Sequence, residues 1–485
     1  MAAARTAEAE VAVVGGGISG LATAYWLVVD HGVDVVVLEA EGRAGGKVST
    51  RTLAGMPVDV GPDAFLSRGV ELAELVSRLG LAEAVVRPAP GGAFIWSRGR
   101  LRPIPAGGAF GIPDRVLPLV RSRLLSPAGI LRAGLDLVRP RTVLGGDPTV
   151  AEVVRPRLGD EVVERLVQPL LGGVHAGSVD RLSARSTVPD VVELARSSRS
   201  LVLALRRRRR AAPKPAAPPA PPLVSLRGGL GGLTDALVDA VGESRVLRGA
   251  RVSAMRRTDA GWEVIAADTR VTARQVVLAA PAHASADLLV GTTPVLAAEL
   301  RGIHYVDVAT VTLALPRAQV GDLRGTGFLV PPTEGTLVVG CTWLTSKWPQ
   351  LAGDGTDSVL LRCMVGRDGD DRWTTMTDEA LVAAVRADLA RVMGVTATPT
   401  DVLVQRWWRG IPQYLVGHAD RLDRLDRLVP DGLHLTGAGY RGSGLAACVA
   451  SARRTASVVA EHLSCPDRPD PLVLGPDPSR SGATP

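Results

Sequence analysis

The chain has 485 residues, more than a single hydrophobic core usually supports, so we expect two or three lobes. Apolar residues make up 46% of it, yet every stretch long enough to cross a membrane contains charged or strongly polar side chains, which excludes a spanning helix. The net charge of +7 suits an anionic ligand, a membrane surface or nucleic acid; nucleic acid is the weakest of these because only 3% of residues are aromatic.

The cysteines and histidines give no sign of a disulfide framework or a metal centre. The four cysteines are far apart and form no C-x-x-C pair, and none of the seven histidines belongs to an H-E-x-x-H motif. The N-terminal MAAARTAEAE contains acids and no apolar signal core, so we expect a cytoplasmic protein with free thiols and no metal. The cysteines are Cys341, Cys363, Cys448 and Cys465.

The first predicted element is a βαβ unit between Val11 and Glu39. A run of β-branched residues leads into Gly15-x-Gly17-x-x-Gly20, a stretch with helical spacing follows, and a second valine-rich strand ends at Glu39. The glycines permit a tight turn, close approach of the backbone to a pyrophosphate, and tight packing of helix on strand. The N-terminus of the helix attracts phosphate.

The acidic residue that closes this unit has the spacing of a ribose ligand. Glu39 lies nineteen positions after Gly20, where a carboxylate accepts hydrogen bonds from the ribose hydroxyls of an adenosine. An isolated glycine fingerprint can be an ordinary turn, but here both strands, the helix and the acid are in register, so we predict a dinucleotide site. The predicted contacts in this unit are Gly15, Gly16, Gly17, Ile18, Ser19, Gly20, Glu39 and Ala40.

A second glycine-rich loop follows from Gly42 to Lys47 and carries two cations. Such a loop can cover a pyrophosphate from the opposite side, and the alternative is a plain surface turn. A strand ending in a Gly-Pro turn is predicted over 58–66, and an amphipathic helix over 71–79. From these segments we predict cofactor contacts by Gly46, Lys47, Gly61, Pro62, Asp63 and Ala64.

The middle of the chain is predicted to be largely helical. A hairpin over 94–105 turns at Arg98-Gly99, and a helical pattern broken by prolines follows from Ile112 to Leu205. Within it, 168–177 is too glycine-rich for one uninterrupted helix. Five arginines, Arg206–Arg210, precede a proline-rich run, so we interpret 206–222 as a solvated loop, with contact to anionic lipid or a partner protein as the alternative.

The rest of the chain alternates between strands and helices. The stretch 228–233 starts a helix without a preceding long strand and is not a second nucleotide fingerprint. Strands over 245–255, 262–267 and 276–280 are predicted to return to the dinucleotide sheet, and strands over 306–315, 327–330, 336–342 and 358–365 to form a second, mostly antiparallel sheet. The remaining elements are helices over 378–393, 421–428 and 445–462, a strand over 433–436, a glycine loop over 437–444 and a disordered tail after Cys465.

One fingerprint flanked by two further glycine loops indicates a single long, enclosed cofactor, and FAD fits that demand. The predicted fold is therefore α/β (α+β), with a Rossmann-like FAD-binding domain, an antiparallel-sheet substrate domain and an inserted helical lobe. The FAD-binding domain is predicted to comprise 1–95, 223–285 and 400–465, the helical lobe 96–222, the substrate domain 286–399 and the tail 466–485.

Several motifs give the chain a specific resemblance over 11–463. The fingerprint with Glu39, together with Arg43–Lys47, is similar to the opening of the flavin amine oxidase superfamily. More selective segments resemble the protoporphyrinogen and coproporphyrinogen oxidases of haem biosynthesis; they are 61–66, 168–177, 182–183, 411–414 and 416–418. Segments 325–330, 341–343 and 347–349 resemble the soluble Gram-positive bacterial branch, which is associated with coproporphyrinogen III.

The resemblance implies three two-electron oxidations of coproporphyrinogen III, with FAD accepting hydride and O₂ reoxidising it to give three H₂O₂. It implies a shaped apolar pocket rather than a strong acid or base, and we assign no catalytic residue. Gly327 and Leu329 match positions that face the macrocycle, and Arg68 is a candidate partner for a propionate, with a solvent-facing arginine as the alternative. The further predicted flavin contacts are Val252, Trp407, Gly444, Leu445 and Ala446.

The last helix departs from the family pattern. Where relatives begin it with Ile-Pro-Asp-Cys, this chain has Leu445-Ala446-Ala447-Cys448, so any role of that acid near the flavin is absent. Three alternatives stay open: the same flavoenzyme acting on protoporphyrinogen IX, a non-catalytic porphyrin- or flavin-binding protein, and an amine oxidase or carotenoid desaturase. The expected partners are a porphyrinogen and O₂.

Overall fold

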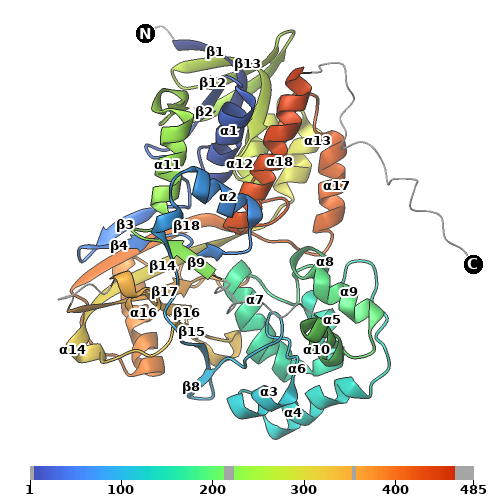
Figure 1. The fold of residues 1–485 in the computed structure, drawn as a ribbon, viewed down its shortest axis with the longest axis vertical. Helices are drawn as coiled ribbons and strands as arrows, with labels where there is room; N and C mark the ends of the chain where they lie inside the picture. The colour runs from blue at the N-terminus through green and yellow to red at the C-terminus, as the bar shows by residue number, and fades with distance from the viewer. Residues whose placement is uncertain (1–4, 212–222, 352–356, 465–485) are drawn as a thin grey trace, which may run out of the picture.

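The computed structural model describes residues 5–211, 223–351 and 357–464. Figure 1 shows three lobes: a sheet covered by helices at the top, a second sheet at the lower left and a group of helices at the lower right. The predicted tail after Cys465 and the proline-rich run 212–222 fall outside the described residues. Across the described part of the chain, no helix combines the length and apolar character needed to cross a bilayer.

The upper lobe is built on a seven-stranded sheet in the order β10-β2-β1-β13-β12-β11, with β19 paired to β13. The pairs that contain β1, β2, β10 or β19 are parallel, and β11-β12-β13 is antiparallel. The strands are β1 (Arg5–Val14), β2 (Val35–Leu38), β10 (Val246–Leu247), β11 (Val252–Thr258), β12 (Gly261–Ala266), β13 (Thr269–Leu278) and β19 (Leu433–Leu435).

Helices cover both faces of this sheet because its parallel strands are apolar on both sides. One core packs the first group of helices against the sheet, α1 (Ile18–His31), α2 (Val70–Arg78), α11 (Gly231–Val241) and α18 (Leu445–Ser464). A second core on the opposite face includes α12 (Ala282–Leu289), α13 (Pro294–Arg301) and α17 (His418–Leu428). The predicted Rossmann-like domain, assembled from distant segments, is confirmed.

The second sheet also has seven strands, in the order β18-β14-β17-β16-β15-β7-β8, and only β15-β7 is parallel. The strands are β7 (Ala93–Ser97), β8 (Arg100–Pro103), β14 (Tyr305–Pro316), β15 (Gly327–Leu329), β16 (Val338–Trp343), β17 (Ser358–Val365) and β18 (Asp401–Pro412). The helix α16 (Asp378–Met393) packs its apolar side chains on this sheet. The predicted antiparallel sheet and its covering helix are confirmed.

The third lobe is a compact group of helices with its own core. Its helices are α3 (Val116–Ser122), α4 (Pro127–Gly134), α5 (Val150–Leu158), α6 (Asp160–Val162), a π-helix (Val163–Val167), α7 (Gln168–His175), α8 (Ala184–Thr187), α9 (Pro189–Ser197) and α10 (Leu201–Ala211). Small elements elsewhere are β3 (Thr50–Leu53), β4 (Met56–Asp59), β5 (Phe65–Leu66), β6 (Val85–Val86), β9 (Leu223–Leu226), α14 (Arg317–Val320) and α15 (Leu344–Lys347). Short 3₁₀ turns cover Ala82–Ala84, Leu135–Leu137, Glu243–Arg245, Pro332–Glu334 and Pro349–Leu351.

One local prediction held and one was wrong. The segment 168–177 is not one uninterrupted helix, because α7 covers Gln168–His175 and ends at Ala176, which has φ +49°. Leu171 and Gly172 are buried in the helical lobe, and this packing outweighs the glycine penalty over the first eight residues. Arg206–Arg210 is not a loop but the last part of α10, which is anchored by buried Leu201 and Leu205 and continued by arginine, a good helix former.

The boundaries between the domains stay a prediction, but strand pairing shows where the sheets draw their residues. The hairpin β7-β8 and the long strand β18 hydrogen-bond into the second sheet, whereas the predicted division at 95 and 400 separates them from it. Strand β18 pairs with β14 over most of its length, from Asp401 opposite Ala314 to Pro412 opposite Tyr305. Hydrogen bonding therefore extends the second sheet beyond the predicted substrate domain.

Candidate functional site

The fingerprint loop lies between β1 and α1 and is tightly packed at its first and third glycines. Gly15 has φ +107°, and a Cβ there would lie 2.9 Å from the backbone nitrogen of Ala280. A Cβ on Gly20 would lie only 1.9 Å from the carbonyl oxygen of Gly15. These two positions accept only glycine, because any side chain would push α1 away from the end of β1.

The middle glycine is different. Gly17 is the N-cap of α1, with φ −73° and ψ 177°, and a Cβ there would meet nothing within 4 Å. No side chain caps this helix end, so its positive dipole is not offset by a capping group. Ile18 and Ser19 form the first turn of α1, and an uncapped helix N-terminus of this kind suits an anion. Their role as cofactor contacts stays a prediction.

Glu39 lies at the carboxyl end of β2, next to the fingerprint. Its buried carboxylate accepts hydrogen bonds from the backbone N–H groups of Gly16 and Glu41, both at 2.8 Å. The carbonyl of Glu39 accepts a bond from Ala250 at 2.8 Å, which places the start of β11, with Val252, near the same strand end. The structure thus brings together Glu39, Ala40 and Val252, whose roles as cofactor contacts stay a prediction.

The second glycine loop folds onto the first. The N–H of Gly45 donates to the carbonyl of Gly16 at 2.7 Å, and a Cβ on Gly46 would lie 3.1 Å from the Cα of Gly17. Lys47 ends this loop with its side chain solvent-accessible but surrounded by protein on most sides, and this burial lowers the pKa of its ammonium. Among the described residues, Lys47 has no ion-pair partner, so it offers an enclosed positive charge for an anionic group.

The loop after β4 packs beneath Lys47. A Cβ on Gly61 would lie 1.8 Å from the carbonyl oxygen of Lys47, which explains the glycine. Two residues on, Asp63 forms ion pairs with Lys347 at 2.7 Å and with Arg362 at 3.8 Å. Burial alone would raise the pKa of Asp63, but these two cations outweigh it and hold that pKa well below its usual range.

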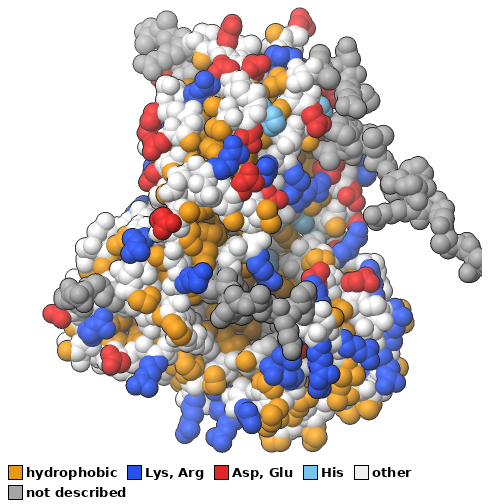
Figure 2. Space-filling view, in the orientation of Figure 1, with side chains coloured by type: hydrophobic (Ala, Val, Ile, Leu, Met, Phe, Trp, Pro, Cys, Tyr) orange, Lys and Arg blue, Asp and Glu red, His pale blue; other side chains and the backbone are white. Residues whose placement is uncertain are grey.

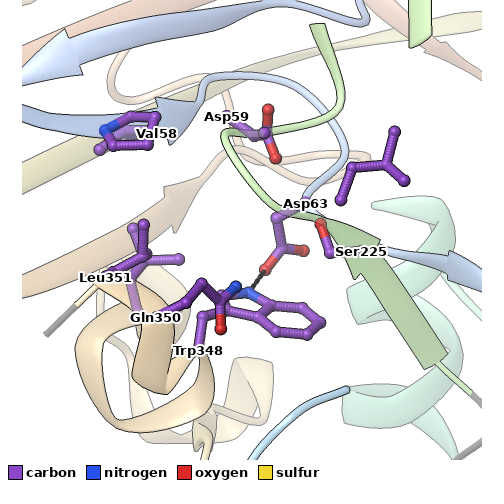
Figure 3. Close-up of a pocket in the computed structure, with 11 residues that line it drawn as sticks. Val58, Asp59, Asp63, Ser225, Trp348, Gln350 and Leu351 are labelled. Carbon is purple, nitrogen blue, oxygen red and sulfur yellow. Dashed lines mark hydrogen bonds between the residues drawn. The ribbon is translucent and has the colours of Figure 1, made fainter. Parts of the chain in front are cut away.

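Figure 3 shows the carboxylate of Asp63 pointing at the indole of Trp348, whose Nε1 donates to it at 3.4 Å. This carboxylate therefore ties the dinucleotide lobe to the helix after β16. We infer that the predicted cofactor contacts at Gly61, Pro62, Asp63 and Ala64 would come from the backbone of this loop, because the Asp63 side chain is occupied by its ion pairs.

The C-terminal glycine loop and the start of α18 lie beside the two other glycine loops. Helix α18 begins at Leu445, and the carbonyl of Gly444 accepts its first intrahelical bond, from Cys448 at 2.9 Å. Burial raises the pKa of the Cys448 thiol, and a hydrogen bond with the Ser19 side chain and the charge of Lys47 act in the opposite direction. The first turn of α1, the second glycine loop and the start of α18 therefore meet at one place.

Tyr414 fixes the shape of this loop. Its hydroxyl donates to the carbonyl of Ala438 at 2.6 Å and accepts from the N–H of Gly442 at 2.8 Å. The ring of Tyr414 stacks on His418, with centroids 4.2 Å apart. The sequence flagged this segment only as a family motif, and its structural role was missed because the partners lie 24 and 28 positions further along the chain.

Trp407 connects the second sheet to the dinucleotide lobe. It lies on β18 opposite Val308, beside an irregularity in the pairing, and its Nε1 donates to the carbonyl of Val60 at 3.0 Å. Val60 directly precedes Gly61. The indole therefore lies against the loop that supports Lys47. Its role as a cofactor contact stays a prediction.

The predicted substrate residues Gly327 and Leu329 lie on β15. Gly327 has φ +137°, and a Cβ there would lie 2.1 Å from the carbonyl oxygen of Cys341, so only glycine fits. A Cβ on Gly173 of α7 would lie 3.2 Å from Leu329, which shows that α7 and β15 touch. The two family motifs 168–177 and 325–330 are therefore neighbours.

Arg68 lies apart from that pair. It is exposed, and the adjacent Gly69 packs so closely on Ala446 that a Cβ would lie 2.6 Å from the Ala446 side chain. Arg68 is thus beside the first turn of α18, and no described contact joins it to Gly327 or Leu329. Figure 2 shows hydrophobic side chains gathered around a hollowed region between the upper lobe and the two lower lobes.

Three further groups were not predicted as site residues. Lys347 and Arg362 hold Asp63, and His175 at the end of α7 has its pKa lowered by burial. The carbonyl of His175 accepts from the side-chain amide of Gln413 at 2.7 Å, which links the helical lobe to the end of β18. The described residues contain no cluster of three or more histidine, cysteine, aspartate or glutamate side chains that could hold a metal ion.

Known proteins resemble this chain over almost its whole length. The profile of the flavin-containing amine oxidoreductases matches residues 18–460. The coproporphyrinogen III oxidase of Bacillus subtilis (strain 168) is 32% identical, covering 93% of this chain and 98% of that protein. The protein of the same name from Mycobacterium bovis is 37% identical, with 93% and 97% covered. A crystal structure from Exiguobacterium sp. 255-15, described as a "putative protoporphyrinogen oxidase", aligns with a TM-score of 0.83 and 32% identity over 94% of this chain and 99% of that one.

Proposed function

The chain belongs to the family of flavin-containing amine oxidoreductases, and on that basis we propose that it oxidises coproporphyrinogen III to coproporphyrin III, with FAD as cofactor and O₂ as the final electron acceptor. The observation that carries this proposal is the length of the match: proteins named coproporphyrinogen III oxidase align over 93% of the chain at 32% and 37% identity. The family motifs occur in the helical lobe and in the second sheet as well as at the fingerprint, so the resemblance extends beyond the cofactor-binding lobe.

The residues present fit FAD. The uncapped N-terminus of α1 and the open space at Gly17 suit a pyrophosphate, and the buried carboxylate of Glu39 suits a ribose. The enclosed ammonium of Lys47 supplies a positive charge where the two glycine loops meet. When bound, FAD supplies the acceptor for the hydride that leaves a meso carbon of the substrate and passes the electrons to O₂.

The chain itself contributes position and enclosure. We propose that Gly327 presents its backbone carbonyl and Leu329 its apolar side chain to one face of the macrocycle, with Arg68 pairing with a propionate. Leu329 also lies against Gly173 of α7, and we propose that these apolar groups keep water from the reacting carbon. Protons lost from the pyrrole nitrogens pass to solvent or backbone, because we assign no residue as a general base.

Protoporphyrinogen IX is the second candidate substrate. It is retained because the Exiguobacterium structure, which aligns with a TM-score of 0.83, is described as a protoporphyrinogen oxidase. The two substrates differ in their number of carboxylates. Cationic side chains at the mouth of the hollow therefore decide between them, and Arg68 is our candidate for one such group. A non-catalytic role is disfavoured because the fingerprint glycines are tightly packed and Glu39 is held beside them, an arrangement that suits a dinucleotide.

We further propose that the protein works in the cytoplasm. The described cysteines Cys341, Cys363 and Cys448 are buried free thiols, which suits a reducing compartment. Besides its porphyrinogen and O₂, contact with a membrane surface or a haem-pathway protein through Arg206–Arg210 is part of this proposal. These arginines are exposed on α10, and Arg208 pairs with Asp190 at 2.7 Å.

The stoichiometry of the reaction tests the proposal. Purified flavin-loaded protein is given coproporphyrinogen III in air, and porphyrin fluorescence and H₂O₂ are measured together. We expect three H₂O₂ for each coproporphyrin III formed and a rate proportional to protein concentration. If coproporphyrinogen III is oxidised no faster with the flavin-loaded protein than without it, the proposed reaction is refuted.

A further inference from the structure

Two side chains hold the C-terminal glycine loop at alternate residues. The hydroxyl of Tyr414 bonds to the carbonyl of Ala438 and to the N–H of Gly442. Between these two residues, the carbonyl of Tyr440 accepts a hydrogen bond at 2.9 Å from Nε2 of His418, which is buried. The rings of Tyr414 and His418 are stacked with 14° between their planes, so the two side chains support the loop together.

The charge state of His418 suits the bond that it makes. Burial lowers the pKa of His418, and the charges of Arg421 and Arg441 act in the same direction. The bond to Tyr440 and the carboxylate of Asp147 oppose this shift. The neutral imidazole has one N–H group, which lies on Nε2 because the Tyr440 carbonyl can only accept. His418 is therefore a neutral donor that is held in one orientation.

The helical lobe holds the segment 414–418 that carries these two side chains. The carboxylate of Asp147 accepts from the N–H of Gly417 at 2.8 Å and from the hydroxyl of Ser183 at 2.6 Å. The N–H of Ser183 donates to the carbonyl of Tyr414 at 2.8 Å. In Figure 1 this contact lies where α17 meets α8. Residues of the helical lobe thus fix the backbone of the segment whose side chains fix the glycine loop.

The glycine loop leads directly into the start of α18. The first intrahelical bond of α18 is accepted by the carbonyl of Gly444, which has no side chain with which to cap the helix. The loop therefore sets the direction in which the N–H groups of the first turn point. Gly444, Leu445 and Ala446 are predicted cofactor contacts, so a displaced loop would move these groups away from FAD.

We propose that His418 and Asp147 are positioning residues for the cofactor. His418 fixes the glycine loop in the conformation that binds FAD, and Asp147 fixes the segment that carries His418. The helical lobe thereby contributes to cofactor binding through segment 414–418. Asp147 lies 270 positions before Gly417, so no local pattern indicates its role. The inference rests on the cofactor of the proposed function and not on its porphyrinogen.

Release of FAD from the flavin-loaded full chain tests this inference. The holoprotein is diluted, the rise in flavin fluorescence gives the Kd for FAD, and visible circular dichroism reports the surroundings of the bound flavin. His418→Leu removes the donor to a buried residue, so the Kd should rise about tenfold and the dichroism should change. His418→Gln restores an N–H donor, and its Kd should rise by less than about threefold.

The second positioning residue is tested through the same loop. Asp147→Asn keeps the shape of the side chain but loses one of its two charged acceptor oxygens, so the Kd for FAD should rise about threefold. Combined with His418→Leu, it should stay within about twofold of His418→Leu alone, because both changes displace one loop. Asp147 is only half-buried, so Asp147→Asn keeps the test decisive if His418→Leu does not fold.

A matched control separates positioning from loss of stability. Ser200→Ala removes a buried hydrogen bond to Asp136, 2.6 Å long, inside the helical lobe. It should lower the melting temperature, as His418→Leu does, but leave the Kd for FAD and the visible dichroism unchanged.

The results decide for or against the two positioning roles. Weaker FAD binding in His418→Leu that recovers in His418→Gln supports the inference. Unchanged Kd values in His418→Leu and Asp147→Asn, or an equal loss in Ser200→Ala, would overturn it. Additive losses in the double variant would overturn the role of Asp147. Each of these outcomes leaves the proposed oxidation of a porphyrinogen unaffected, whereas an unchanged protein that binds no FAD would overturn both.

Discussion

Replacing Gly17 by aspartate should expel the cofactor while leaving the fold intact. Gly17 has φ −73° and ψ 177°, a conformation that any residue adopts, and a Cβ there would meet no atom within 4 Å. The position is the N-cap of α1, which no side chain caps. An aspartate would cap the helix and so stabilise the cofactor-free protein by about 1 kcal/mol.

The cost to the cofactor follows from charge. The same carboxylate would stand where we place the pyrophosphate, and two like charges about 4 Å apart repel by about 4 kcal/mol at the effective dielectric constant of roughly 20 found near protein surfaces. Flavin affinity should therefore fall by roughly a thousandfold. Gly17→Ala adds bulk without charge and should weaken binding by less than about tenfold, since the space is open.

Flavin content after gel filtration and the melting temperature measure these effects. We expect a colourless Gly17→Asp protein with the melting temperature of the cofactor-free unchanged chain or slightly above it, and a yellow Gly17→Ala protein. A yellow, fully loaded Gly17→Asp protein would refute our placement of the pyrophosphate. A Gly17→Asp protein that fails to fold would contradict the open space at this position, and Gly20→Ala, whose Cβ would lie 1.9 Å from a carbonyl oxygen, shows what such a failure looks like.

Three further changes test other parts of the site. Glu39→Gln keeps a hydrogen-bond acceptor but removes its charge, so flavin affinity should fall about tenfold in a fluorescence titration. Burial raises the pKa of Asp59 to about 6, which makes its ionised form unfavourable in the fold. The free energy of unfolding should therefore fall as pH rises from about 4 to about 6. At pH 8 Asp59→Asn should have a higher melting temperature and a free energy of unfolding larger by up to about 3 kcal/mol. Both bonds to Asp59, from Thr50 at 2.6 Å and Leu230 at 2.9 Å, reach one oxygen that asparagine retains. Gly327→Ala should lower melting temperature and kcat/KM together, because β15 must shift.

Each of these has a contrary outcome. Unchanged flavin affinity in Glu39→Gln would show that the ribose does not contact this carboxylate. Parallel pH profiles for Asp59→Asn and the unchanged protein would show that Asp59 is ionised without cost. Gly232→Ala in α11 is the control for Gly327→Ala, because a Cβ on Gly232 would meet nothing within 4 Å. An equal loss of activity in both variants would show that the loss in Gly327→Ala does not come from a shift of β15.

Local patterns predicted the elements that carry the cofactor. The fingerprint, the second strand and Glu39 lie within one short segment, so their geometry follows from strand and helix periods alone. The hairpin turn at Arg98-Gly99 was predictable for the same reason, and both residues have positive φ as a two-residue turn requires. Helix α16 has the predicted bounds because a threonine N-cap and a glycine C-cap bracket its apolar pattern.

Long-range partners were out of reach. The pair between Asp63 and Lys347 joins residues 284 positions apart, and nothing in either neighbourhood identifies the other. The bond from Trp407 to Val60 spans 347 positions. The extent of α7 could not be predicted, because its glycines argue locally against a helix while the burial that stabilises it depends on the rest of the lobe.

The most direct measurement compares the two porphyrinogens as substrates of the flavin-loaded protein. Aerobic kcat/KM values are determined for coproporphyrinogen III and protoporphyrinogen IX under the same conditions, from porphyrin fluorescence. Our account predicts a clear preference for coproporphyrinogen III, reduced in Arg68→Ala through a higher KM. A preference for protoporphyrinogen IX would contradict the proposed substrate but keep the reaction, and oxidation of neither would contradict the proposed function as a whole.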